Sequence, residues 1–594
     1  MSTRAHGQVR RSQVITTWGP GALIDLPRHS AIVGGLETWP NIGDLDEIVD
    51  QRVTQKLGLL MGVSDPRLYA PPADSSAPGE PKRGIGVWRF PQYFLVQEKA
   101  QQDARSRSRR VVPQRVLEKG RYDGCDVVPT RFVRACPRGH ISDFDWRGFV
   151  HSRGEGCTGQ LWLDETGTGG DLADLVIRCE CGNSRGLYEA AESGTLGVCR
   201  GDRPWLGSNA REECDQPARL LIRTAANAYF PQVLSVLSLP DNRTTLQQTV
   251  GELWDDLSIV ESAGELAFVK KKPKIAAKLG GLSDSDVLEA IEQVKHGGAE
   301  RPVKQVELDA LLAVPEGYGD DIPVDPNFHA RRLPEKVWKN TPLTDGIESV
   351  TQLHRLREVL ALTGFTRFEA VTPDVNGEFE TDVVSASLAE EPTWFPAVEN
   401  RGEGLFVLLD PSAVSAWLVR QAVVDRLDAL RAGHQEWITQ RNSSRAFPGG
   451  PYVLLHTLSH LLVQSMAMRC GYPASSIRER VYVDPDGGRY GLLLYTASPD
   501  AEGTLGGLVQ QAVDIEGHLA AALRSGGLCS NDPVCAQHDP VGGQLEGRLL
   551  HGAACHGCAL IAETSCEMRN DYLDRALVVP TLAVPGAAFF DPVT

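Results

Sequence analysis

The cysteines near the end of the chain constrain its fold more than any other sequence feature. Five of the 13 cysteines fall within under forty residues, in the segments CSNDPVC and CHGCALIAETSC. Thiolates bind zinc tetrahedrally, and a C-x-x-C turn presents two sulfurs to one ion from a short backbone segment. The cluster therefore predicts a structural zinc site, because an all-sulfur shell leaves no open position for chemistry. Its members are Cys529, Cys535, Cys555, Cys558 and Cys566.

A second set of candidate zinc ligands lies in the N-terminal half. The segment CPRGH has a glycine that permits a tight turn between cysteine and histidine, and CECG places two thiols one residue apart. The alternative is a set of free buried cysteines, which pack as small hydrophobic side chains. Zinc is favoured because seven ligands suffice for one site and nearly for two. The seven are Cys136, His140, Cys157, Cys179, Cys181, Cys199 and Cys214. Cys125 and Cys470 lack such neighbours and are expected in cores.

The length of 594 residues is too great for one core, so several domains are expected. The segment MSTRAHGQVRRSQ at the start is polar and basic and lacks the apolar stretch of a secretion signal. Cysteines in this setting predict a reducing, cytoplasmic compartment. The longest apolar stretch, 453–463, is too short for a membrane span, which needs roughly 20 apolar residues.

Composition shifts along the chain predict an α+β protein of four parts. Both halves are expected to contain a cysteine-rich, zinc-binding domain, and the one at the C-terminus is expected to be α/β. The parts are an N-terminal domain with a Pro-rich loop at 64–84 (1–125), a metal-binding domain (126–240), a mostly helical middle region (241–440) and a C-terminal zinc-binding domain (441–594).

Apolar spacing predicts several elements within these parts. Residues three or four apart share a helical face over 283–297, again at Leu353, Leu356 and Leu360, and most strongly over 452–469. The apolar segment 490–495 predicts a strand.

The formal net charge of −17 excludes a protein that coats nucleic acid by bulk electrostatics. Any DNA contact must come from local patches. Two basic runs are candidates, although solvated surface is the favoured interpretation of both. They contain Arg105, Arg107, Arg109, Arg110 and Arg115 in the first and Lys270, Lys271, Lys272, Lys274 and Lys278 in the second.

Two features allow a test for enzymatic chemistry. His456 and His460 lie one helical turn apart in HTLSH, a spacing that chelates metal in hydrolases, but Thr457 replaces the glutamate that would act as general base. Packed histidines are therefore favoured. The rival hypothesis is a metal-dependent hydrolase or nuclease that adds a carboxylate such as Asp500. The glycine-rich turn at 503–507 lacks Gly-Lys-Ser/Thr, as does the whole chain, so a P-loop motor is not expected.

Six blocks spread over most of the chain match a known family in order. They are RRSQVITTWGPGALIDLP, RFVRACPRGHISDFDW, RPWLG, ENRGEGLFVLLD, LLHTLSHLLVQSMAMRCGY and GAACHGCALIAETSCEMRNDYLDRALV. Together they resemble the DrmB family of DISARM, a bacterial anti-phage defence system. The last blocks are similar to the helicase-associated zinc-binding domain of some superfamily 2 DNA helicases. That domain has one cysteine, then G-C-P-x-C, a further cysteine and an N-x-x-L-D-like stretch.

The resemblance implies ligands and a role. It places Cys555, Cys558 and Cys566 as the last three ligands, leaves the first open between Cys529 and Cys535, and matches the following stretch to Asn570, Leu573 and Asp574. It implies a non-catalytic accessory subunit that pairs with a DrmA-like helicase subunit and engages DNA through the complex. A hydrolase and a stand-alone DNA-binding module remain the alternatives.

Overall fold

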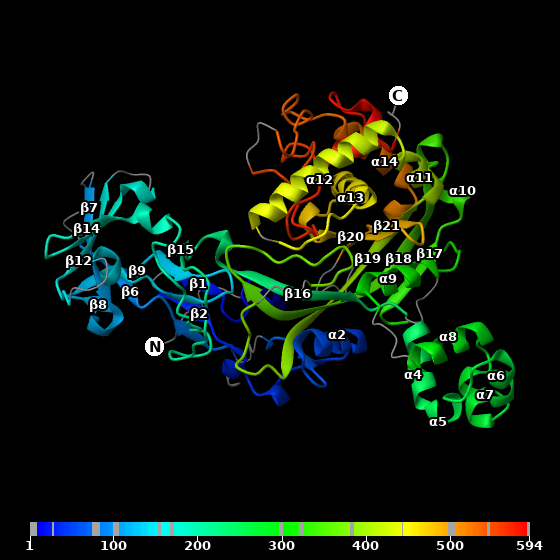
Figure 1. The fold of residues 1–594 in the computed structure, drawn as a ribbon, viewed down its shortest axis with the longest axis horizontal. Coiled ribbons are helices and arrows are strands. Elements are labelled where there is room, and N and C mark those ends of the chain that lie inside the picture. Colours follow the sequence, from blue (N-terminus) through cyan, green and yellow to red (C-terminus); the bar gives the residue numbers. More distant parts are fainter. Residues whose placement is uncertain are drawn as a thin grey trace. The chain divides into compact units, whose positions relative to one another are not determined.

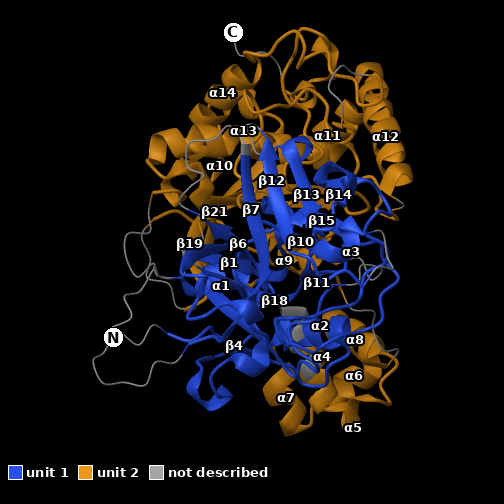
Figure 2. Cartoon of the chain, turned by 90° about the vertical axis from the view of Figure 1, so that its left-hand side faces the viewer, with its two compact units in different colours: residues 1–236, 359–372, 381–399 blue, residues 237–358, 373–380, 400–594 orange. Residues whose placement is uncertain are grey.

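The chain folds into two compact units (Figure 2). Unit 1 comprises 1–236, 359–372 and 381–399, and unit 2 comprises 237–358, 373–380 and 400–594. Both contain helices and sheet, which confirms the α+β, multidomain prediction; the four-part division stays a prediction. The computed structural model describes residues 9–26, 29–73, 84–98, 106–151, 156–166, 171–240, 242–295, 301–319, 325–379, 385–441, 443–496, 507–542 and 547–590.

Unit 1 is built mainly on antiparallel sheets, and its one parallel pair among the described strands joins β4 to the start of β19 (Trp394–Leu409). Its largest sheet has the order β14-β13-β12-β7-β6-β9-β8, and two three-stranded sheets have the orders β1-β2-β5 and β11-β10-β15. In β13, Leu175, Ile177 and Cys179 alternate inward, so the strand ends with a thiol on its buried face. The strands are β1 (Leu23–Leu26), β2 (His29–Val33), β3 (Glu47–Ile48), β4 (Arg67–Tyr69), β5 (Val87–Arg89), β6 (Tyr93–Gln97), β7 (Ser106–Pro113), β8 (Arg121–Tyr122), β9 (Cys125–Pro129), β10 (Phe132–Ala135), β11 (Ile141–Asp143), β12 (Leu161–Thr166), β13 (Leu175–Cys179), β14 (Ser184–Gly186) and β15 (Arg219–Ile222). The helices are α1 (Arg11–Thr16), α2 (Gln51–Met61) and α3 (Trp146–Val150).

Unit 2 has a core of helices packed on sheet (Figure 1). Helix α13 (Gly450–Cys470) contacts α14 (Ile515–Gly526) and the hairpin of β20 (Ile477–Asp484) and β21 (Arg489–Thr496). These elements confirm the helix predicted over 452–469 and the strand predicted over 490–495. The Gly449 cap has a φ of 87° and Pro451 follows in the first turn, which fixes where α13 begins. The other helices are α9 (Val303–Leu312), α10 (Glu335–Trp338), α11 (Pro411–Leu418) and α12 (Gln421–Arg441), and one more strand is β17 (Phe328–Arg332).

Five short helices of unit 2 pack around a core of their own. The last of them, α8, confirms the helix predicted over 283–297. None of the helices in the described part of the chain is both long and apolar enough to cross a membrane. The five are α4 (Asn242–Glu252), α5 (Trp254–Leu257), α6 (Ala263–Val269), α7 (Pro273–Leu279) and α8 (Asp284–Lys295).

The helix predicted around Leu353 and Leu360 is wrong. The structure has a strand there, β18 (Ile347–Thr366), which precedes β19 (Trp394–Leu409); these two and β16 (Phe230–Leu237) extend into both units. The final eleven residues of β18 are all buried. A strand that is buried on both faces shows no alternation, so its apolar residues also fit a helical spacing.

Candidate metal centres

The structure brings eleven of the 13 cysteines into four groups of metal-ligating side chains. Within each group the candidate ligand atoms lie within 4.8 Å of one another. The two remaining thiols, Cys125 and Cys470, belong to none of these groups and are half-buried. We name the groups the knuckle group (Cys136, His140, Cys199, Cys214), the hairpin group (His151, Cys157, Cys179, Cys181), the four-thiol group (Cys529, Cys535, Cys555, Cys558) and the mixed group (His456, His460, Glu479, Cys566).

The knuckle group begins in the tight turn between β10 and β11. Cys136 and His140 flank Gly139, whose φ is 91°, and Cys136 Sγ lies 3.4 Å from His140 Nδ1. The distance from Cys136 Sγ to Cys214 Sγ is 4.0 Å. A tetrahedral zinc with Zn–S bonds of ~2.3 Å requires sulfur–sulfur edges of about 3.8 Å. The described side chains therefore fit a zinc ion without rearrangement.

Neighbouring groups orient the knuckle ligands. Glu212 Oε1 lies 2.5 Å from His140 Nε2, so this carboxylate accepts that N–H and leaves Nδ1 available as a ligand. A hydrogen bond from Cys136, against the effect of burial, lowers the pKa of Cys199 to about 4. Arg367 is buried and donates from Nε to Gly139 O at 2.8 Å and from Nη2 to Gly21 O at 2.7 Å. This guanidinium ties the metal-binding turn to the Gly-Pro-Gly turn near the start of the chain.

The hairpin group contains a candidate ligand that sequence reasoning missed. Cys179 ends β13 and Cys181 lies in the turn before β14, and Cys179 Sγ lies 3.6 Å from Cys157 Sγ. The fourth member is His151, whose Nε2 lies 3.3 Å from Cys181 Sγ while its Nδ1 donates to Arg147 O at 2.9 Å. His151 follows α3 and has no short ligand spacing to the cysteines in the sequence. Only the folded hairpin brings it near the thiols. The backbone N–H of Asn183 lowers the pKa of Cys181 to about 7.

The four-thiol group includes both of the cysteines between which the sequence left the choice open. Cys529 Sγ lies 3.4 Å from Cys555 Sγ, and Cys558 Sγ lies 3.7 Å from both Cys535 Sγ and Cys555 Sγ. These lengths also match a tetrahedron of about 3.8 Å edges. The group thus has four candidate sulfur ligands without Cys566.

Backbone hydrogen bonds and the buried guanidinium of Arg575 stabilise negative charge on these four sulfurs. The backbone N–H of Gly557 donates to Cys555 Sγ at 3.3 Å. Arg575 is fully buried and pairs with Asp532 at 2.5 Å. A hydrogen bond from Cys558, against burial and with help from the charge of Arg575, lowers the pKa of Cys535 to about 6. A shell of four thiolates with one Zn²⁺ has a net charge of −2, and a nearby guanidinium offsets part of it.

The N-x-x-L-D-like stretch supports the loops around the four-thiol group. Asn570 accepts from Ile561 N at 2.9 Å and donates to Ile561 O at 3.0 Å, as a paired strand residue would. Asp574 Oδ1 accepts from Ala553 N and Ala576 N, both at 3.0 Å, and Oδ2 pairs with Arg426 Nε at 2.5 Å. Asn570 and Asp574 thus bind backbone groups of these loops through their side chains, and Leu573 packs in one apolar cluster with Cys535, Cys555 and Cys558.

Cys566 lies with the mixed group, apart from the thiols beside which the sequence pattern placed it. His456 and His460 extend from one face of α13, Glu479 extends from β20, and His456 Nε2 lies 3.1 Å from Cys566 Sγ. Although burial opposes the shift, the charges of the two histidines hold the pKa of Glu479 well below its usual range. Thr457 donates to Val453 O and accepts from Asp574 N at 2.9 Å, so it has a structural role.

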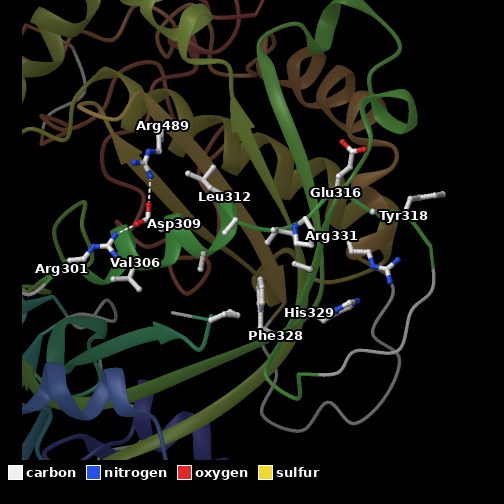
Figure 3. Close-up of a pocket in the computed structure, with 17 residues that line it drawn as sticks. Arg301, Val306, Asp309, Leu312, Glu316, Tyr318, Phe328, His329, Arg331 and Arg489 are labelled. Carbon is white, nitrogen blue, oxygen red and sulfur yellow. Dashed lines mark hydrogen bonds and ion pairs between the residues drawn. The ribbon is translucent and has the colours of Figure 1, made fainter. Parts of the chain in front are cut away.

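A cavity of about 930 Å³ in unit 2 is lined from α9 and β17 (Figure 3). The charged side chains that line the cavity mostly form ion pairs or hydrogen bonds with other lining residues. Asp309 accepts from Arg489 at 2.6 Å and also pairs with Arg301, while Arg331 donates to Gly319 O at 2.6 Å. No metal-ligating group of the described residues lies in this cavity.

Three comparisons with known proteins bear on these sites. The family model described as "MrfA Zn-binding domain" matches residues 458–559, a span that contains the whole four-thiol group and ends before Cys566. A family model described as a domain of unknown function matches residues 10–230. A curated protein of Bacillus paralicheniformis, DISARM protein DrmB, is 31% identical over 495 residues, which are 78% of this chain and 82% of that protein.

The fold and the ligand groups define a multidomain α+β protein that binds zinc. The sequence comparison makes the relation specific: the chain belongs to the DrmB family of the DISARM anti-phage defence system. Both results confirm the resemblance found in the sequence.

Proposed function

We propose that the knuckle, hairpin and four-thiol groups bind structural zinc, and that the chain is a non-catalytic accessory subunit for a DrmA-like helicase in anti-phage defence. The observation that carries the proposal is the closure of each group: four protein ligands lie within 4.8 Å of one another and complete a zinc shell. A catalytic zinc keeps one position for water or substrate, whereas a structural zinc does not. Zinc in such sites stabilises the fold around it.

The absence of a motor supports an accessory role. Gly-Lys-Ser and Gly-Lys-Thr occur nowhere in the sequence, so the chain has no P-loop to cradle nucleotide phosphates. The chain thus has a zinc-binding domain similar to that of the MrfA model but no nucleotide-binding motor of the P-loop type. This combination is expected of a protein that acts together with a separate helicase subunit.

The charges on the surface favour DNA contact through a complex. Carboxylates offset part of the positive charge of both basic runs. Arg110 pairs with Glu98 at 2.7 Å, and Lys270 pairs with Asp284 at 2.6 Å. Arg105 lies outside the described residues. Paired cations on a chain of net charge −17 release few counterions from DNA, so we expect weak, salt-sensitive binding by the chain alone. This expectation separates the accessory subunit from a stand-alone DNA-binding module.

The rival hydrolase is disfavoured by burial. The side chains of His456 and His460 are fully buried, and their neighbours Glu479 and Cys566 are buried as well, so none of the four is exposed to a substrate and its water. Asp500, the carboxylate named for that chemistry, lies outside the described residues.

The test is co-purification with a DrmA-like helicase, followed by a DNA-stimulated ATPase assay with and without this chain. We expect a stable complex, tighter DNA binding by the complex than by either subunit, and no DNA hydrolysis by this chain alone. Cys558→Ser should lose zinc and weaken the complex, whereas Cys470→Ser serves as the matched control because Cys470 belongs to no ligand group. Failure to form a complex contradicts the subunit role; nuclease activity that disappears in His460→Ala contradicts the non-catalytic assignment.

A further inference from the structure

We propose that the mixed group is a second, separate metal site in the C-terminal half, with His456, His460, Glu479 and Cys566 as ligands. Its edges are close to those of a tetrahedral shell. His456 Nε2 lies 3.1 Å from Cys566 Sγ and 3.0 Å from Glu479 Oε1, and His460 Nε2 lies 3.3 Å from the same oxygen. Zinc bonds of ~2.0–2.1 Å to nitrogen and oxygen require edges of about 3.4 Å. An ion at the centre needs only small outward shifts of these atoms.

Three elements present the ligands, and their hydrogen bonds select the metal-binding atoms. His460 Nδ1 lies 2.8 Å from Ala559 O, so it donates there and leaves Nε2 with its lone pair toward the group. Glu479 is oriented by Ser459, whose hydroxyl donates to Oε2, and by Glu567 N, which donates to Oε1 at 3.2 Å. Such outer contacts are typical of metal ligands because they fix the tautomer of the imidazole and the rotation of the carboxylate.

A bound metal explains why two imidazole nitrogens, a carboxylate oxygen and a sulfur converge on one point, which hydrogen bonds alone do not explain. The Nε2 atoms of both histidines point at one oxygen, Glu479 Oε1, and Nε2 of His456 also faces the Cys566 sulfur. A single N–H donates well to only one acceptor. His460 already donates from Nδ1, so an N–H at its Nε2 as well would make this ring a buried cation. A divalent cation interacts with all four atoms at once.

The ligand set also specifies the charge of the site and its metal. One thiolate and one carboxylate neutralise a divalent ion, so the shell has no net charge. The four side chains are at most 7% exposed, and a neutral shell is the form that such a buried position accepts at least cost. The four-thiol group, whose zinc shell has a charge of −2, has Arg575 nearby instead. One sulfur, two imidazoles and one carboxylate match zinc better than magnesium or calcium.

The site is structural, because all four positions belong to the protein. It joins one face of α13 to β20 and to the loop that contains Cys566. This proposal stands apart from the proposed function, since it depends neither on the helicase nor on the three other groups.

The test measures metals by mass spectrometry in the full-length chain, purified without oxygen or chelator. We expect four zinc ions per chain in the wild type and in Cys470→Ser, three in Cys566→Ser, and three in Cys558→Ser. The double variant Cys558→Ser/Cys566→Ser should bind two. Equal zinc content in the wild type and in a folded Cys566→Ser variant would overturn the proposal, whatever number the other three groups bind.

A measurement on the wild type decides the question if Cys566→Ser does not fold. Zinc X-ray absorption counts the average ligands per ion, and the four groups together supply eleven sulfurs to four ions, against ten sulfurs to three ions without the mixed group. We expect about 2.8 sulfurs per zinc. A value near 3.3, with three ions bound, refutes the site even when no variant is available.

Discussion

Replacing Asp574 with asparagine tests whether a buried ion pair stabilises the loops of the four-thiol group. The side chain of Asp574 is fully buried, and its Arg426 partner on α12 is 9% exposed. Asparagine retains an oxygen for Ala553 N and Ala576 N but leaves the guanidinium without its counter-charge. Breaking such a pair costs about 3–5 kcal/mol. Asp428→Asn is the matched control, because Asp428 and Arg431 form a pair on the same helix that is 63% and 58% exposed; exposed pairs contribute about 0–1 kcal/mol.

Hydrogen exchange with mass spectrometry measures this difference locally, in the full-length zinc-loaded chain. At ~1.4 kcal/mol per factor of ten, the amides of Ala553 and Ala576 should exchange about two to three and a half orders of magnitude faster in Asp574→Asn. Asp428→Asn should change them less than about fivefold. Adding Arg426→Met to Asp574→Asn should recover part of the loss, because the unpaired charge is removed. Equal exchange in Asp574→Asn and Asp428→Asn would refute the reasoning.

Two further predictions concern other parts of the chain. Gly139→Ala should lose the zinc of the knuckle group and lower the melting temperature, because the new Cβ would lie 2.6 Å from Ala386 Cβ at a φ of 91°. The control is Gly194→Ala, where the φ is 82° but no neighbour lies within 4 Å of the new Cβ. Equal zinc loss from both variants in metal analysis contradicts a steric cause. Burial lowers the pKa of His518 from 6.5 to about 4, so the unfolded chain binds the proton more readily and stability falls as pH drops from about 6.5 to 4. Melting temperatures at pH 7.5 and 5.5 should differ less in His518→Gln than in the wild type, and an unchanged difference speaks against this linkage.

Local patterns predicted the helices α8 and α13, and they grouped candidate ligands that lie close together in the sequence. The Cys136–His140 turn is an example, because a single glycine brings both ligands together. The limits appear where tertiary contacts decide. β18 was expected to be helical because burial on both faces removes the strand alternation.

The ligand groups show the same limit. His151 has no ligand spacing to its thiols, and His456 lies 110 residues before Cys566, so neither pairing is visible in a local pattern. Cys566 follows Cys558 closely in the sequence, yet the backbone turns away between them and delivers it to α13 and β20. Proximity along the chain was therefore a poor guide to which thiols lie together.

The long sequence separation within the ligand groups has a consequence for synthesis. Cys136 and Cys214 are 78 residues apart, and His456 and Cys566 are 110 residues apart. A nascent chain leaves the ribosome from its N-terminus, so Cys136 emerges well before the partner that completes its shell. During that interval the early thiols are reduced, unmetallated and open to oxidation or to a wrong metal. Production in zinc-poor or oxidising cells should therefore yield protein in which the ligand groups lack metal and the units around them are incompletely folded.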